Sequence, residues 1–116
     1  MQKLTITIDK DVQLNTHIAH FDGAFDGSVK EPLAVLEELI NASPAKTNLI
    51  LDFKGLSYLN SYAIGQLVAW HNHLVKGEGQ VMIAAPAKNV EDIFSILGIS
   101  NLFKIFPDID TAKQSL

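Results

Sequence analysis

The stretch from Leu51 to Gly65 contains the serine that is best placed for chemistry. It starts as an apolar strand, passes through a short polar loop and begins a helix at Asn60 or Ser61. A hydroxyl in the first turn of a helix, just after a strand, lies where α/β proteins commonly hold an anion or carry a modification. Either Asn60 caps the helix and leaves the Ser61 hydroxyl available, or Ser61 is itself an ordinary N-cap. We interpret Ser61 as a phosphorylatable residue.

Catalysis by a serine nucleophile needs a strained elbow, an adjacent histidine and oxyanion donors. The glycines that flank such a serine in hydrolases are missing around Ser61, and nothing in the sequence places a histidine beside it. We therefore predict no catalytic residue and no enzymatic activity.

The sequence also lacks the usual patterns of metal and cofactor sites. His17 and His20 are three apart in a predicted strand and point to opposite faces, while His71 and His73 diverge by roughly 200° on a helix. His71 falls within an apolar stripe, which favours a partly buried histidine with its polar atoms satisfied. The glycine-containing loops match neither a Walker loop nor a dinucleotide fingerprint. We expect no metal and no cofactor.

Composition restricts the class of protein further. The chain has 116 residues, 47% of them hydrophobic and 19% charged, and no cysteine, which fits a single domain over residues 1–116 without disulfides. Its net charge is −4 and its nine basic residues are scattered lysines, which argues against direct nucleic-acid binding. No apolar run is long enough to span a bilayer and no signal-peptide pattern is present, so we expect a cytoplasmic protein.

Hydrophobic periodicity predicts alternating strands and helices. The expected strands cover residues 4–8, 12–21, 48–53, 80–85 and 102–106, and the expected helices cover about 28–42, 61–76, 89–97 and 108–116. This order implies an α/β fold in which the first two strands form an antiparallel hairpin, with Asp9 to Asp11 as its turn.

Several residues are expected at the ends of these helices. Asp26 or Ser28 could cap the first helix, Gly77 is expected to end the second in a left-handed conformation, and Gly98 to end the third. The core stripe of the second helix is predicted to comprise Ile64, Leu67, Val68, Leu74 and Val75.

Three segments resemble the STAS domains of bacterial anti-sigma factor antagonists. The run LILDFKGLSYLNSYAIG at residues 49–65 resembles the family signature of an apolar strand, Asp-Leu, a short loop, Asp-Ser-Ser-Gly and Leu-Gly. The runs FDGAFD at 21–26 and IFSILGISNLFKIF at 93–106 resemble the earlier and later segments of the family. They occur in the family's order and together cover nearly the whole chain.

The resemblance implies a single STAS-like domain, a mixed β-sheet of four to five strands with helices packed largely on one face. It also implies partner switching: a cognate anti-sigma serine kinase phosphorylates Ser61, and a PP2C-type phosphatase removes the phosphate. The residues expected to contact the partner are Asp26, Asn60, Tyr62, Ala63 and Gln66.

The signature departs from the family at three positions. Asn60 replaces an aspartate, Tyr62 replaces the second serine and Ala63 replaces a glycine. The Tyr62 ring either extends the docking surface or folds onto the loop at Tyr58. The alternative function is a non-switching STAS subunit docked on a transporter or signalling complex.

Overall fold

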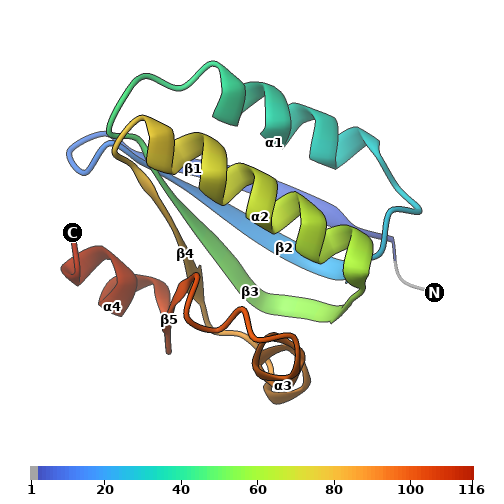
Figure 1. Ribbon diagram of the computed structural model, residues 1–116. Coiled ribbons are helices and arrows are strands. Elements are labelled where there is room, and N and C mark those ends of the chain that lie inside the picture. Colours follow the sequence, from blue (N-terminus) through green and yellow to red (C-terminus); the bar gives the residue numbers. More distant parts are fainter. Residues whose placement is uncertain (1–2) are drawn as a thin grey trace.

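Five strands form one mixed sheet in the order in which they occur along the chain (Figure 1). The computed structural model describes residues 3–116. The strands are β1 (Thr5–Asp11), β2 (Thr16–Phe25), β3 (Asn48–Leu59), β4 (Gln80–Ala84) and β5 (Lys104–Phe106). β1 pairs with β2 antiparallel and the remaining pairs are parallel, so the predicted initial hairpin and mixed sheet are confirmed.

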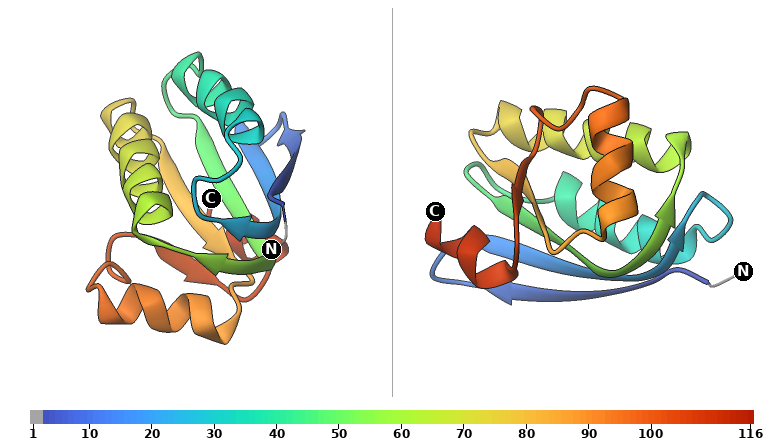
Figure 2. Two further views of the ribbon diagram at one scale, coloured as in Figure 1. Left: turned by 90° about the vertical axis from the view of Figure 1, so that its right-hand side faces the viewer. Right: turned by 90° about the horizontal axis from the view of Figure 1, so that it is seen from below.

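Four helices surround this sheet. They are α1 (Glu31–Asn41), α2 (Ser61–Lys76), α3 (Lys88–Ile96) and α4 (Ile109–Gln114). Helices α1 and α2 lie side by side over one face, whereas α4 lies on the other face (Figures 1 and 2). The prediction of helices largely on one face is therefore confirmed, with the short α4 as the exception.

The apolar side chains divide into two clusters, one on each face of the sheet. The larger cluster lies under α1, α2 and α3 and includes Phe21, Phe53 and Trp70. The smaller one lies under α4 and includes Ile50 and Met82. Because α4 is only six residues long, the rest of this second face stays open.

Strands β2 and β3 are longer than the sequence predicts. β2 continues through Gly23 to Phe25, and β3 continues through Gly55 to Leu59, with two register shifts between them. Gly23 has a φ of +106°, and a Cβ there would lie 2.1 Å from the Lys3 carbonyl oxygen. The glycines that suggested a loop instead permit close contacts within bulged strands.

The hairpin turn and the first cap also differ from expectation. Residues 9–11 belong to β1, and the turn lies at Val12–Asn15, where Asn15 has a φ of +51°. α1 begins at Glu31 with no side-chain cap, so neither Asp26 nor Ser28 caps it. The end of α3 follows the prediction, because Gly98 has a φ of +71°.

The end and the buried face of α2 require correction. Gly77 has a φ of −93°, so it is not left-handed, and the left-handed residue is Glu78 at +66°. The buried residues are Ala63, Leu67, Trp70 and Leu74, while Val75 is 47% exposed. No helix within residues 3–116 is long and apolar enough to cross a membrane.

Candidate functional site

The junction between β3 and α2 determines how Ser61 is presented. β3 ends at Leu59, and the extended backbone of Asn60 (φ −123°, ψ −171°) precedes the first helical residue, Ser61. The Asn60 Oδ1 accepts a hydrogen bond of 3.2 Å from the Ala63 N–H. Asn60 is therefore the N-cap, and the alternative in which Ser61 caps its own helix is wrong.

The Ser61 side chain is exposed at the first position of α2. Its hydroxyl makes no hydrogen bond to any residue between 3 and 116. The first turn of α2 contains no acidic side chain, so no fixed negative charge opposes an anion there. The free N–H groups and the positive end of the helix dipole favour a negative charge at this position.

The Asn60 amide also binds a second segment of the chain. Its Nδ2 donates a hydrogen bond of 3.1 Å to the backbone carbonyl of Asp26, in the loop between β2 and α1. An amide can donate and accept at once, whereas an ionised carboxylate only accepts. The asparagine thus connects this loop to α2 in a way that an ionised aspartate could not.

Tyr62 lies beside Ser61 and against the same loop. Its ring packs edge-on against Phe25 with centroids 6.3 Å apart, and a Cβ added to Gly27 would lie 3.1 Å from the ring. The contact made by the ring is thus with the β2–α1 loop rather than with Tyr58. The side chain is still 38% exposed, so it forms part of the surface around Ser61.

Asp26 is held in place by Ser28. One carboxylate oxygen accepts hydrogen bonds from the Ser28 hydroxyl at 2.6 Å and from the Ser28 N–H at 2.9 Å. These two bonds hold the pKa of Asp26 below its ordinary value. The residue is an ionised group at the rim of the site.

The other two predicted contact residues lie apart from this surface. Ala63 is completely buried, so its side chain lies beneath the surface that a partner would reach. Gln66 is half-buried and lines a hollow of about 360 Å³ together with Glu37 and Asn41 of α1. The structure therefore brings Asp26, Asn60 and Tyr62 around Ser61, with Ala63 below them and Gln66 facing α1.

The surroundings of Ser61 do not contain the groups that a catalytic serine nucleophile needs. Within residues 3–116 no histidine is hydrogen-bonded to Ser61, and five surface hollows are lined by other residues. His71 is half-buried, as predicted, and packs edge-on against Phe103, but its Nδ1 has no hydrogen-bond partner within residues 3–116, which the sequence did not lead us to expect. The described residues contain no group of three or more side chains that could hold a metal ion.

One polar cluster was missed by the sequence analysis. His20 lies between Asp9 and Asp52 on the open face of the sheet and contacts both carboxylates. The three residues come from three strands, and only the register of those strands brings them together. Spacing along the chain contains no signal for such a contact.

Comparison with known proteins agrees with this architecture. An anti-sigma-factor antagonist (STAS) domain protein from Planctomyces limnophilus superposes with a TM-score of 0.83 at 12% identity, covering 95% of this chain and 96% of that one. The Bacillus cell fate determinant SpoIIAA in its phosphorylated form gives a TM-score of 0.72 at 16% identity, covering 97% and 100%.

A third similar structure belongs to another functional class. A sulfate transporter family protein from Wolinella succinogenes gives a TM-score of 0.72 at 16% identity, covering 88% of this chain and 84% of that one. No curated protein matches the chain significantly in sequence. At these identities the structures show a shared fold. The STAS domain family itself matches residues 7–112, and with the sheet order and the β3–α2 junction described above, this shows that the chain belongs to the STAS domain family.

Proposed function

We propose that this STAS domain is a regulatory binding protein that changes partners when Ser61 is phosphorylated by a cognate anti-sigma serine kinase. The unmodified form binds the kinase, and a PP2C-type phosphatase removes the phosphate. The domain itself has no catalytic role in this scheme, and it acts in the cytoplasm.

The main support for this proposal is that Asn60 caps α2 and leaves Ser61 exposed. Asn60 satisfies the Ala63 N–H and leaves the neighbouring Ser61 hydroxyl exposed and without a hydrogen bond within residues 3–116. Adding a phosphate therefore breaks no hydrogen bond that the described fold needs. A serine that served as the cap could not be modified without loss of the cap.

The same geometry explains how a phosphate can alter binding without unfolding the domain. A phosphoserine adds about −1.5 to −2 charges at neutral pH, and the start of a helix stabilises such a charge. A partner seated against α2 would instead meet new bulk and charge at its centre. The effect is thus expected on the bound state and not on the fold.

The surface next to Ser61 suits a closely packed partner. Gly65 lies one helical turn further along α2, and a Cβ built there meets nothing within 4 Å. Tyr62 adds a partly exposed ring on the neighbouring side. A small residue beside an aromatic one permits close approach of a partner backbone and supplies an apolar contact.

The proposal is tested first by locating the modification. The protein is isolated from its native cells in the presence of phosphatase inhibitors, and the phosphorylated residue is mapped by mass spectrometry. We expect phosphate on Ser61. Phosphate only on another residue, or none under any growth condition, would contradict the proposal.

Partner capture supplies the second test. Immobilised wild-type protein should retain an ATP-binding kinase from native lysate, and Ser61→Asp should reduce its capture at least tenfold. Ser95→Asp on α3 is the matched control, because it adds the same charge at another exposed helical serine. Equal capture by wild type and Ser61→Asp would contradict the switching role.

A non-switching subunit of a transporter or signalling complex is the second candidate. The similar fold of the sulfate transporter family protein favours it. In this case Ser61→Ala should retain full activity in cells under every condition. The switching proposal instead requires that this variant bind the kinase and become unresponsive to it.

A further inference from the structure

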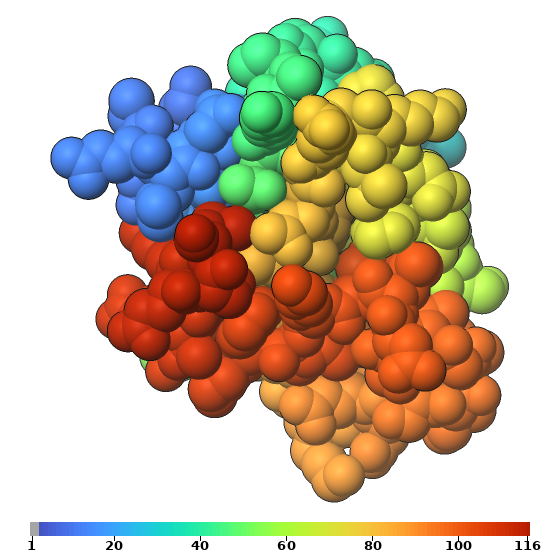
Figure 3. Space-filling model, turned by 60° about the vertical axis from the view of Figure 1, so that its left-hand side comes forward, coloured from blue at the N-terminus to red at the C-terminus, as the bar shows by residue number. Residues whose placement is uncertain are grey.

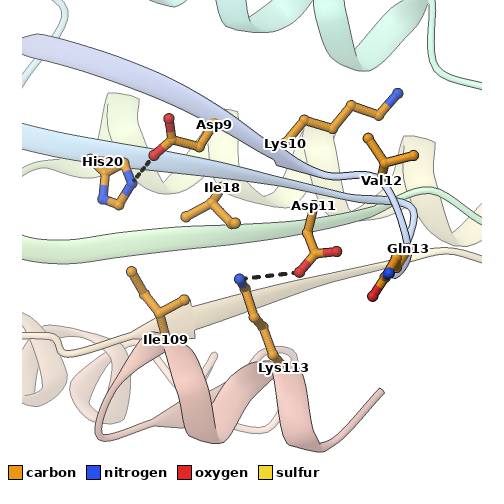
Figure 4. Close-up of a pocket in the computed structure, with 9 residues that line it drawn as sticks. All are labelled: Asp9, Lys10, Asp11, Val12, Gln13, Ile18, His20, Ile109 and Lys113. Carbon is orange, nitrogen blue, oxygen red and sulfur yellow. Dashed lines mark hydrogen bonds and ion pairs between the residues drawn. The ribbon is translucent and has the colours of Figure 1, made fainter.

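His20 lies on β2, beside α4, on the sheet face that this short helix only partly covers. Figure 3 shows the β1–β2 hairpin and α4 next to each other, and Figure 4 shows His20 in the hollow where they meet. His20 also lines a second hollow of about 530 Å³ with Thr5, Thr7 and Lys54. Ile109 and Lys113 of α4 line the first hollow together with His20, and α4 lies on the opposite face of the sheet from α2, so the site is separate from the Ser61 surface.

Both ring nitrogens of His20 contact carboxylates. Nδ1 lies 2.7 Å from Oδ2 of Asp52 on β3, and Nε2 lies 2.9 Å from Oδ2 of Asp9 on β1. Ionised carboxylates only accept hydrogen bonds, so both bonds exist together only when both nitrogens carry a proton. In this arrangement an imidazolium on β2 connects the edge strand β1 to the central strand β3.

We propose that His20 is a pH-dependent clamp, which holds β1 to β3 through Asp9 and Asp52 as an imidazolium and releases Asp9 when it loses one proton. A neutral imidazole keeps one N–H donor and presents a lone pair at its other nitrogen. That lone pair would face a carboxylate oxygen, so one of the two contacts becomes repulsive.

The difference in exposure determines which contact is lost. The side chain of Asp52 is 15% exposed and that of Asp9 is 65% exposed. A buried carboxylate depends on its protein donor, whereas an exposed one can be hydrated. The remaining proton therefore stays on Nδ1 with Asp52, and Asp9 turns to water.

The surrounding charges are consistent with an imidazolium at neutral pH. Hydrogen bonding to Asp52, and then to Asp9, raises the pKa of His20 above its ordinary value in spite of partial burial. The other charged groups that line the two hollows around the ring are Lys10 and Asp11 on β1, Asp22 on β2, Lys54 on β3 and Lys113 on α4. Lys113 is paired with Asp11 at 3.2 Å, as Figure 4 shows.

NMR provides the first part of the test. The ring ¹⁵N shifts of His20 in the full chain should report two protonated nitrogens at low pH, followed by deprotonation of Nε2 alone. Over the same pH change, the hydrogen-exchange protection of β1 amides bonded to β2 should fall about two- to fivefold, the range expected from loss of one largely exposed ion pair. A neutral His20 ring at pH 5 would overturn the proposal.

The second part uses a matched pair of variants. In Asp9→Asn the amide can donate to the neutral Nε2, so the contact survives deprotonation and the pH-dependent fall in β1 protection should disappear. Asp22→Asn removes a carboxylate that lines the same hollow but does not contact His20, and it should retain the fall. A fall that persists in Asp9→Asn, or disappears in Asp22→Asn, would contradict the assigned contact.

Discussion

Ser61 stands at a position where the fold should tolerate, and even favour, a negative charge. Ser61→Asp places a carboxylate in a first turn that has no other acidic residue. We expect the free energy of unfolding to stay unchanged or to rise by up to about 1 kcal/mol through the helix dipole. Urea unfolding at low ionic strength measures this, with Ser61→Lys as the opposite-charge control. A loss of stability in Ser61→Asp would show that the hydroxyl has a structural role.

Asn60 both caps α2 and binds the β2–α1 loop, and different substitutions remove one or both of these hydrogen bonds. Asn60→Ser keeps an N-cap oxygen for Ala63, but its shorter side chain loses the bond that the Asn60 amide donates to the Asp26 carbonyl, so it should lower the free energy of unfolding by about 1 kcal/mol. Asn60→Ala loses the cap as well and should lower it by about 2 kcal/mol.

The family's own residue gives the sharper comparison at this position. Asn60→Asp restores the charge next to Ser61 but loses the bond to Asp26. Because the helix dipole offsets part of this loss, its stability should lie between that of Asn60→Ser and that of the wild type. Urea unfolding of the three variants checks the order. Wild-type stability in Asn60→Ser would mean that the bond to the β2–α1 loop contributes nothing.

At the scale of elements, the connection from α2 to β4 depends on Gly79 more than on Gly77. A Cβ on Gly79 would lie 1.9 Å from the carbonyl oxygen of Thr47, which is backbone and cannot rotate away. On Gly77 the nearest atom would be 3.4 Å distant and the φ of −93° suits any residue.

The two alanine variants should therefore differ clearly in stability. Gly79→Ala should lower the free energy of unfolding by about 2–3 kcal/mol through overpacking, and Gly77→Ala should change it by less than about 0.5 kcal/mol. Thermal unfolding of both variants distinguishes them. The reverse order would mean that the left-handed cap lies at Gly77 after all.

The same elements show what the sequence reveals and what it hides. Periodicity predicts all four helices, and the pattern of an apolar strand, a short polar loop and a helix predicts the junction around Ser61. The sequence did not reveal that β2 and β3 continue past Gly23 and Gly55, because a glycine in a bulge and a glycine in a loop look alike in one sequence. The His20 contacts were hidden for a related reason, since they depend on the register of three strands.

At the scale of the whole molecule, two histidines on β2 give stability opposite dependences on pH. Carboxylates raise the pKa of His20, whereas burial and the charge of Lys10 lower that of His17. Because the pKa of His20 is raised in the folded state, its contribution to the free energy of unfolding is complete below its ordinary pKa of about 6.5. This contribution is lost as pH rises through the pKa of the folded state. Because the pKa of His17 is lowered in the folded state, its contribution to the free energy of unfolding is complete above a pH of about 6.5. This contribution is lost as pH falls through the pKa of the folded state.

The two contributions together predict a stability maximum close to pH 6.5, measured as the urea midpoint across a pH series. The lowered pKa values of Asp11, Asp26 and Asp108 act only at more acidic pH, below their ordinary value of 3.8. His20→Gln should remove the decline above pH 6.5 and leave the decline below it, and His17→Gln should do the reverse. Since both residues lie on one strand but face opposite sides of the sheet, an identical effect of the two variants would contradict the separate environments that the structure assigns to them.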